Sequence, residues 1–304
     1  MKTCMRTLLT SVLVVAGSIA NSETIDISGT PAYPDVSADT DLAQNTEAKR
    51  DIVLLDLDLL EIAGALGAFD RIIARPRAGD LEVPDTIPHV FKERPGVEGI
   101  MAMRPAVVIA SNPRYNRLRE QLEQLGVKTL LIDQSNPANE KVMHLASVLD
   151  MKEQGEKLST MILSDYEAVA SKLEEGAARK LIHVSRYGSG GNFSVGGMET
   201  PVDNLIKRVG AENPAGAIGL NRYRRATQEG IIQMRPDAIL FASVEIDIVG
   251  DLKNLWSDFP GLTYTPAGKH ERIVLMRNMH VRADAASSGI ATTALYDALQ
   301  KMFP

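Results

Sequence analysis

Two clusters of arginine and tyrosine are the residues of this chain whose types and spacing best suit ligand binding. Arg186 and Tyr187 follow an apolar segment, and the second cluster comprises Arg222, Tyr223, Arg224 and Arg225. A phenol beside a guanidinium is a suitable ligand for ferric iron, because nearby positive charge favours the phenolate form. Arginine also binds carboxylates through two parallel hydrogen bonds. The two clusters are therefore candidate sites for iron and for carboxylate groups.

A long polar segment, residues 75–96, holds two further candidates and contains four prolines. A loop of this length in a compact protein is usually functional. His89 could coordinate iron through a neutral imidazole, and Arg94 could bind a carboxylate. We therefore expect this segment to contribute to the ligand site from a different part of the chain.

One supersecondary motif occurs twice. Residues 98–111 read EGIMAMRPAVVIAS, and residues 229–243 read EGIIQMRPDAILFAS. In each copy a short apolar helix is predicted to end at Arg-Pro, because proline lacks an N–H group and disfavours helical geometry in the residue before it. A buried strand then follows. The two copies predict two similar lobes, with Glu98 and Glu229 at equivalent helix starts, where the helix dipole favours a carboxylate.

Short apolar runs with β propensity alternate with amphipathic segments on both sides of a helical stretch. Continuous runs such as 52–55 and 181–184 fit parallel strands that are buried on both faces. From about 136 to 175 no strand is predicted, and apolar residues recur at the spacing of helices. The sequence therefore predicts an α/β fold of two α/β lobes, each with a central mainly parallel sheet, joined by a long helical backbone.

The N-terminus has the pattern of a secretory signal peptide. Lys2 and Arg6 precede a mostly apolar run from Leu8 to Ala20, which is too short for a membrane span. The only cysteine, Cys4, lies in this segment, so the mature chain has no thiol. The predicted organisation is a signal peptide (1–22), a flexible lead-in (23–50), an N-terminal lobe (51–134), a helical connector (135–179) and a C-terminal lobe (180–304).

Composition and motifs argue against several classes of function. The 304-residue chain has 33 basic and 39 acidic residues and a formal net charge of −6, which argues against nucleic acid or an anionic membrane surface as its partner. The glycine-rich segment 188–191 resembles a serine-hydrolase loop only superficially, because the histidines show no pattern that would supply a base. No zinc or phosphate-loop motif is present. An exported serine hydrolase is therefore only a remote alternative to a binding protein.

The order of the predicted elements resembles that of a known family. A strand, a helix ending Ala-Leu-Gly-Ala, a second strand, a proline-rich segment and the Glu-to-Pro motif are followed by a helical stretch and a second lobe with the same motif. This order is similar to that of the periplasmic substrate-binding proteins of ABC importers for haem, cobalamin and ferric siderophores, over residues 51–304. The segment 195–213, VGGMETPVDNLIKRVGAEN, most resembles the haem-binding subgroup.

The resemblance implies a periplasmic binding protein, not an enzyme, whose ligand lies in a cleft between the lobes. It implies that Glu98 and Glu229 dock onto arginines of a transmembrane ABC permease, which receives the ligand. It also implies that the transported ligand is haem. A ferric siderophore or cobalamin is the alternative ligand.

One position departs from the haem-binding pattern. Members of that subgroup usually carry an iron-coordinating tyrosine in the loop after the second strand, but residues 75–96 contain none, and Val83 stands at about that position. The expected iron ligands are therefore Tyr187 first, Tyr223 second and His89 third. The arginines expected to meet the porphyrin are Arg94, Arg186, Arg222 and Arg224.

Overall fold

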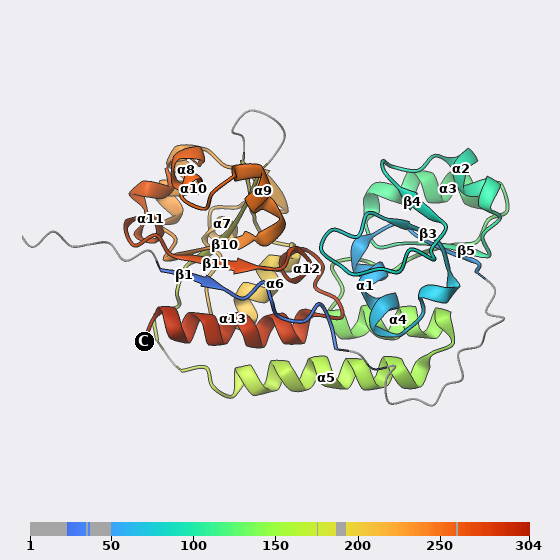
Figure 1. The fold of residues 1–304 in the computed structure, drawn as a ribbon, viewed down its shortest axis with the longest axis horizontal. Coiled ribbons are helices and arrows are strands. Elements are labelled where there is room, and N and C mark those ends of the chain that lie inside the picture. Colours follow the sequence, from blue (N-terminus) through green and yellow to red (C-terminus); the bar gives the residue numbers. More distant parts are fainter. Residues whose placement is uncertain (1–22, 35, 37–49, 175, 187–192, 260) are drawn as a thin grey trace, which may run out of the picture.

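The protein has two α/β lobes that pack against a shared layer of helices (Figure 1). The computed structural model describes residues 23–34, 36, 50–174, 176–186, 193–259 and 261–304. Each lobe contains one sheet, and most strands within each sheet are parallel. None of the described helices is long and apolar enough to cross a membrane. The prediction of two α/β lobes with mainly parallel sheets is confirmed.

The sheet of the N-terminal lobe has five parallel strands in the order β4-β3-β2-β5-β6. They are β2 (Ile52–Leu54), β3 (Ile72–Pro76), β4 (His89–Phe91), β5 (Val107–Ala110) and β6 (Thr129–Leu131). The central strands β2 and β5 are buried throughout, as expected for continuous apolar runs in a parallel sheet. Because all five strands run the same way, their carboxyl ends lie along one edge, where connecting loops form ligand sites.

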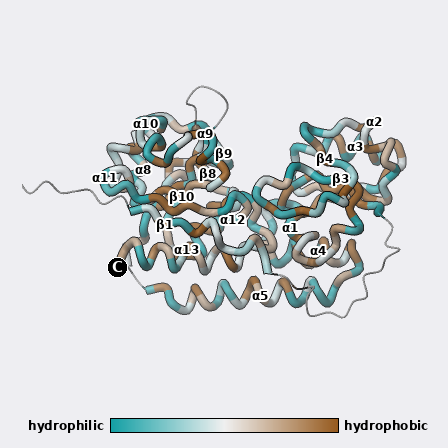
Figure 2. The backbone as a smooth tube through the Cα atoms, viewed as in Figure 1, coloured by the Kyte–Doolittle hydropathy of each residue, from teal (hydrophilic) through white to brown (hydrophobic). Residues whose placement is uncertain are grey.

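Within the described part of the chain, the sheet of the C-terminal lobe has six strands in the order β1-β11-β10-β7-β8-β9. They are β1 (Thr24–Asp26), β7 (Leu181–Arg186), β8 (Phe193–Gly196), β9 (Tyr223–Arg225), β10 (Ala238–Ala242) and β11 (Ile273–Met276). The first four in spatial order are parallel, whereas β8 and β9 pair antiparallel. Figure 2 shows hydrophobic residues concentrated along strands such as β10, with more polar segments outside them.

Short helices connect the strands in both lobes. In the N-terminal lobe they are α1 (Leu57–Ala65), η1 (Phe69–Arg71), α2 (Val97–Met103), η2 (Pro113–Tyr115) and α3 (Asn116–Gln124). In the C-terminal lobe they are α6 (Pro201–Arg208), α7 (Pro214–Ala217), α8 (Gln228–Met234), η3 (Ser243–Glu245), α9 (Ile246–Val249), α10 (Asn254–Asp258), η4 (Leu262–Tyr264), α11 (Pro266–Lys269) and α12 (Asn278–Arg282). Their placement leaves loops at the carboxyl edges of both sheets.

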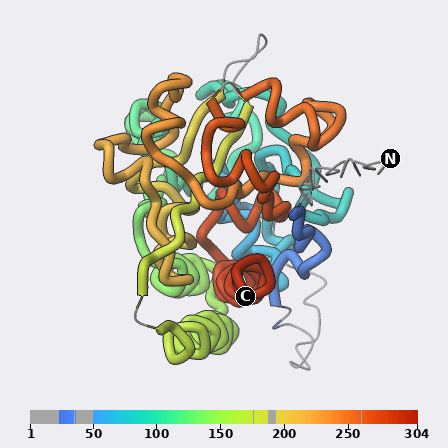
Figure 3. The backbone as a smooth tube through the Cα atoms, turned by 90° about the vertical axis from the view of Figure 1, so that its left-hand side faces the viewer, coloured from blue at the N-terminus to red at the C-terminus, as the bar shows by residue number. Residues whose placement is uncertain are grey.

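Three long helices form the layer that joins the lobes: α4 (Ala138–Leu149), α5 (Lys152–Ala170) and α13 (Ser288–Met302). The 19 residues of α5 span about 28 Å, and this helix packs on α4 under one lobe and on α13 under the other (Figure 1). Figure 3 shows the three helices together below the sheets. Glycine permits both close contacts, because a Cβ on Gly155 would overlap Ala146 and one on Gly289 would lie 2.6 Å from Asp165.

The two copies of the repeated motif have the same local structure. Glu98 and Glu229 are the second residues of α2 and α8, and each helix ends at an arginine with left-handed backbone geometry, Arg104 with φ 50° and Arg235 with φ 49°. Proline follows each arginine and stops the helix. The predicted helix-to-strand unit is therefore confirmed in both lobes.

Residues 23–34 and 36 differ from the predicted flexible lead-in. β1 pairs with β11 in the C-terminal sheet, and Arg272 Nε lies 2.8 Å from a carboxylate oxygen of Glu23. Val36 is fully buried in the core of the N-terminal lobe. The lead-in prediction is therefore wrong for these residues, because partners far along the chain hold them. Residues 37–49 and the predicted signal peptide lie outside the described part of the chain.

The segment 75–96 also differs from its prediction as a loop. His89, Val90 and Phe91 form the edge strand β4, which pairs in parallel with β3. The sequence gives little sign of this strand, because it is three residues long and follows three prolines of the segment. The strand places Phe91 and the residues after it at the carboxyl edge of the sheet.

Buried polar contacts fix one lobe against the other. The Lys141 ammonium lies 3.3 Å from the Asp58 carboxylate and donates to the carbonyl of Ala283 at 3.1 Å. Glu61 accepts the backbone N–H of Ser287 at 2.7 Å. These contacts connect α1 and α4 to the segment between α12 and α13. They form a buried polar interface between the lobes, called the seam below.

Candidate ligand site

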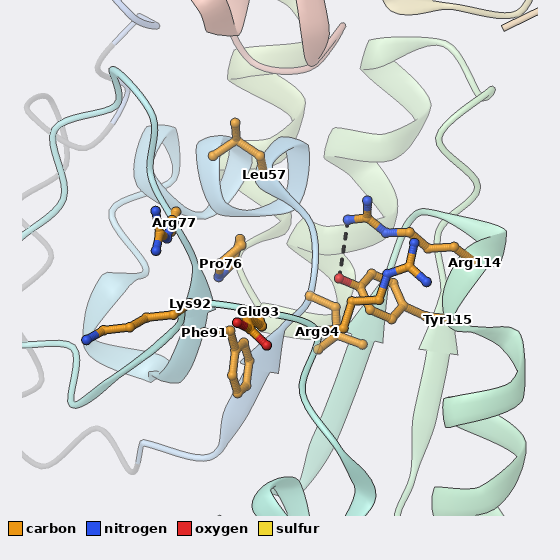
Figure 4. A pocket seen from close by; sticks show the side chains of 10 residues that line it. Leu57, Pro76, Arg77, Phe91, Lys92, Glu93, Arg94, Arg114 and Tyr115 are labelled. Carbon is orange, nitrogen blue, oxygen red and sulfur yellow. Dashed lines mark hydrogen bonds between the residues drawn. The ribbon is translucent and has the colours of Figure 1, made fainter. Parts of the chain in front are cut away.

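A pocket of about 330 Å³ lies at the carboxyl edge of the N-terminal sheet (Figure 4). The residues that line it follow or end four of the five strands: Leu55 and Leu57 after β2, Pro76 and Arg77 at β3, Phe91, Lys92, Glu93 and Arg94 at β4, and Arg114 and Tyr115 after β5. The parallel topology brings these separate segments together. This edge is the expected position of a ligand site in an open α/β sheet.

The pocket has an excess of positive charge. Four of its lining residues are cations (Arg77, Lys92, Arg94 and Arg114), against the single acid Glu93. The side chains of Leu55, Leu57 and Phe91 provide apolar surface beside these charges. The arrangement suits an anionic ligand that also has a large apolar face.

The carboxyl edges of the two sheets face each other beside this pocket. Asp80, which follows β3, accepts the backbone N–H of Asn278 at 2.7 Å, and Asn278 follows β11. In the C-terminal lobe, Val244 and Ile248 follow β10 and are exposed, at 38% and 56%. The second lobe therefore presents exposed apolar residues at its own carboxyl edge.

Tyr115 and Arg114 form a fixed pair within the pocket. Arg114 Nη2 donates to the Tyr115 hydroxyl at 3.2 Å and to Asp56 Oδ1 at 2.9 Å. The other carboxylate oxygen of Asp56 accepts the backbone N–H groups of Ser111 and Asn112, at 2.8 and 3.0 Å. The backbone that follows β5 thus binds Asp56, Asp56 binds Arg114, and Arg114 contacts the phenol.

The local sequence explains why Arg114 and Tyr115, which follow β5, lie at the pocket. Asn112 caps η2, because its side chain accepts the backbone N–H of Arg114 at 3.0 Å, and Pro113 occupies the first helical position. The turn directs the Tyr115 ring into the core of the lobe, where the residue is only 6% exposed. The ring is therefore held in one position by packing as well as by its hydrogen bond.

Burial and nearby charges have opposing effects on the pKa values of Tyr115 and Asp56. Burial raises the pKa of Tyr115, whereas the charges of Arg114 and Arg94 act to lower it. Burial also raises the pKa of Asp56, with the charge of Asp58 as the second cause, and the hydrogen bonds from Ser111 and Asn112 act against it. Burial outweighs the opposing effects at both groups, so the pKa of each is raised above its ordinary value.

Of the residues predicted in the first lobe, Arg94 lines the pocket and His89 does not. His89 is exposed and lies two residues before Phe91 on β4, toward the amino end of the strand. Sequence reasoning missed Arg77, Lys92, Arg114 and Tyr115. A signal for the last two was present, because Arg114-Tyr115 repeats the arginine-tyrosine pairing of Arg186-Tyr187 after a predicted strand.

Tyr223 and Arg186, both predicted in the second lobe, are linked through one polar network, because Arg282 donates to Glu245 at 3.2 Å. The Tyr223 hydroxyl lies 3.1 Å from His183 Nδ1, and the Arg282 guanidinium lies over the Tyr223 ring at 4.8 Å. Burial raises the pKa of Tyr223 to about 12. The backbone N–H of Arg186 donates to Glu245 at 2.8 Å, and its guanidinium donates to the carbonyl of Ile248 at 3.1 Å. Tyr187 lies outside the described residues.

Arg222 and Arg224 are exposed near the loop that carries Asn221. Hydrogen bonds from Ser135 lower the pKa of Asp133 in the N-terminal lobe, and the charge of Arg222 lowers it further. Arg222 therefore lies close enough to Asp133 for its charge to act on that carboxyl group, and its Nε lies 4.0 Å from a carboxylate oxygen of Glu199 in its own lobe. Arg224 donates to the carbonyl of Asn221 at 3.1 Å.

Glu98 and Glu229 are exposed, and their helices α2 and α8 lie at the outer ends of the two lobes, away from the layer of long helices (Figure 1).

No metal cluster of histidine, cysteine or acidic side chains occurs among the residues that the structure covers.

Two lobes on a shared helical layer, with a charged pocket at a sheet edge, define a two-lobed binding protein. Residues 52–279 match the family described as periplasmic binding protein, and the chain belongs to that family. No curated protein sequence matches the chain at a significant level.

Solved structures with this fold include several proteins described as haem-binding. The apo form of periplasmic heme-binding protein RhuT from Roseiflexus sp. RS-1 is 25% identical, with a TM-score of 0.69, over 82% of this chain and 99% of that chain. Periplasmic heme-binding protein BhuT in complex with two hemes is 24% identical, with a TM-score of 0.71, over 84% and 99%. Periplasmic heme-binding protein HutB of Vibrio cholerae is 21% identical, with a TM-score of 0.68, over 84% and 100%.

Proposed function

We propose that this protein binds haem in the periplasm and delivers it to the transmembrane permease of an ABC importer. The observation that carries the proposal is the pocket, which is lined by four cations, a phenol and apolar side chains. Haem combines a flat apolar ring, two propionate groups and a ferric iron, so it needs all three kinds of contact. The likeness to RhuT, which is a haem-binding protein, supports the same ligand.

The pocket can hold only part of such a ligand. Its volume of about 330 Å³ is at the lower end of the range of roughly 300–1,000 Å³ that is typical of small-molecule sites. The ring would therefore extend toward the second lobe, where Val244 and Ile248 offer apolar surface and Arg222 offers charge. Arg94 and Arg114 would bind the propionates, because arginine pairs with carboxylates through two hydrogen bonds.

Delivery is assigned to Glu98 and Glu229. Both are exposed at equivalent positions of the two lobes, so they can meet two matching basic sites on a permease at the same time. Export by the signal peptide 1–22 places the protein in the periplasm. The protein is a carrier and not an enzyme in this proposal, and haem is its transported ligand.

Titration of the mature protein with haemin, followed by absorption in the Soret region, tests the proposal. We expect saturable binding that weakens at high salt, because propionate–arginine contacts are screened. The absence of saturable haemin binding would contradict it. Binding of a ferric siderophore or of cobalamin in place of haemin would assign the protein to another ligand class.

A matched pair of variants tests the role of the pocket charge. Arg94→Gln should weaken haemin binding, since it removes a lining cation, whereas Arg117→Gln changes an exposed arginine of α3 that does not line the pocket. Equal losses in both variants would show that overall charge, and not the pocket, determines binding.

A further inference from the structure

The N-terminal lobe lacks a tyrosine in residues 75–96, but its pocket contains one from another part of the chain. The geometry points to Tyr115 as the residue that ligates the iron of bound haem, an assignment that rests on the proposed function. The phenol belongs to η2, which follows β5, and it reaches the same pocket that the residues after β3 and β4 line. Figure 4 shows its hydroxyl among the lining side chains.

Tyr115 is held in one position, as a side chain that coordinates iron needs to be. Its ring packs in the core of the lobe, and among the described residues its hydroxyl has one hydrogen-bond partner, Arg114, at 3.2 Å. An oxygen that accepts one hydrogen bond retains lone-pair capacity for a metal. The iron can therefore bind without breaking the contact that orients the phenol.

Arg114 favours the anionic form of Tyr115 and so acts against the effect of burial. Its guanidinium lies 4.7 Å from the centre of the Tyr115 ring and donates to the phenol oxygen, so it stabilises the phenolate that ferric iron requires. Asp56 fixes Arg114 from the other side at 2.9 Å. A side chain that orients a metal-coordinating residue and stabilises its anionic form commonly tunes the affinity for the metal.

The other candidate ligands are less suitably placed. The Tyr223 hydroxyl is bonded to His183, and Arg282 covers its ring. His89 is exposed on β4 outside the pocket lining. Among the candidates within the described residues, Tyr115 alone combines a place in the pocket with an adjacent cation.

The ligation step requires no change in oxidation state. The Tyr115 phenol loses its proton to solvent, and its oxygen forms a bond to the ferric iron. The water or hydroxide that occupied this axial position of haemin leaves. The iron remains ferric throughout.

The test compares haemin with metal-free protoporphyrin IX in wild type and Tyr115→Phe. Phenylalanine retains the buried ring and removes only the oxygen. We expect haemin affinity to fall by at least about 10-fold, in line with the 10- to 100-fold effects seen even for residues that only support a metal ligand. Protoporphyrin affinity should remain unchanged, because the porphyrin ring and propionates are the same. The phenolate-to-iron charge-transfer band should disappear.

Tyr264→Phe serves as the control, since Tyr264 is 65% exposed in η4 and lies outside the pocket. It should retain the charge-transfer band and wild-type affinity. A band that persists in Tyr115→Phe, or that is lost in Tyr223→Phe instead, would overturn the assignment while leaving haem binding intact. Failure of the wild type to bind haemin would overturn the proposed function itself. Circular dichroism of each variant confirms that the fold is retained.

Discussion

Arg114 contacts an acid on one side and a phenol on the other, and this position determines what it can do. Asp56 holds the guanidinium at 2.9 Å, and two backbone N–H groups hold Asp56. The arginine is therefore pre-oriented before any ligand arrives, which lowers the entropy that binding must cost. Its charge acts on Tyr115 and on an incoming carboxylate from a single place.

Replacing Arg114 with glutamine should weaken haemin binding by about 10-fold or more, as expected when a group that supports a metal ligand is lost. The phenolate-to-iron band should also shift, because the phenol oxygen loses its charged hydrogen-bond donor. Haemin titration followed by absorption measures both effects. Arg117→Gln on α3 is the control, and a variant with wild-type affinity and an unshifted band would contradict the role of Arg114.

Glu61 should make the stability of the protein fall as pH rises. It is fully buried, and burial raises its pKa from 4.5 to about 8, opposed by hydrogen bonds from Ser287 and by the charge of Lys141. Between these two values the unfolded chain releases the proton and the folded chain keeps it. The free energy of unfolding should therefore decrease by about 2 to 3 kcal/mol between pH 5 and pH 7 from this group alone.

The variant Glu61→Gln isolates this contribution. Its amide oxygen can still accept the Ser287 N–H, but the side chain no longer titrates. Urea unfolding at pH 5, 6 and 7 should give a flatter pH dependence than in wild type. Glu120→Gln, at an exposed position of α3, should keep the wild-type slope. An identical slope in Glu61→Gln would contradict the assignment.

At the level of single residues, the sequence predicted arginine–tyrosine pairs but did not single out the pair that lines the described pocket. The pairing of arginine with tyrosine was recognised at Arg186-Tyr187 and at Tyr223, but the pair that lines the described pocket is Arg114-Tyr115. Spacing alone could not select among them, because the pocket depends on which strands are neighbours. The order β4-β3-β2-β5 brings residues 92–94 and 114–115 together, and this order is not readable from local pattern.

At the level of elements, α2 and α8 are the parts of the fold that the sequence predicted most completely. Proline fixes their ends, and the repeated motif fixes their equivalence. The strands β1 and β4 were missed, because each is three residues long and lies at a sheet edge. Their hydrogen-bond partners, and not their own composition, make them strands.

Charge reversal on these two helices should separate delivery from binding. The variant Glu98→Lys with Glu229→Lys should lower haem transport in membranes reconstituted with the permease, because like charges would replace the proposed ion pairs. Haemin affinity and thermal stability should change little, since exposed ion pairs contribute only about 0.2–1 kcal/mol to stability. Reversal of Glu120 and Asp297, exposed on α3 and α13, is the control. Normal transport in the first variant would exclude the docking role.

At the level of the whole molecule, the seam between the lobes depends on a fully buried ammonium group. Lys141 of α4 contacts Asp58 of α1 and the carbonyl of Ala283 across the seam. Lys141→Met should destabilise the protein by about 3 to 5 kcal/mol, because it leaves the Asp58 charge buried without its partner. Thermal or urea unfolding measures the loss.

Two further variants make this prediction specific. Lys141→Met combined with Asp58→Asn should recover part of the stability, since no unpaired charge then remains. Lys152→Met, at an exposed position of α5, should have little effect. A double variant that is no more stable than Lys141→Met would indicate that lost packing, and not the unpaired charge, is responsible.

The pairing of β1 with β11 has a consequence for the order in which the protein matures. Glu23 and Arg272 beside this pair are 249 residues apart, whereas the five strands of the other sheet all lie between Ile52 and Leu131. Contacts between distant residues form late, because a long loop must close first. As the chain emerges during synthesis or export, the N-terminal lobe can fold before β11 is available to pair with β1. Pulsed hydrogen exchange during refolding should therefore protect amides of β2 and β5 before those of β1 and β11.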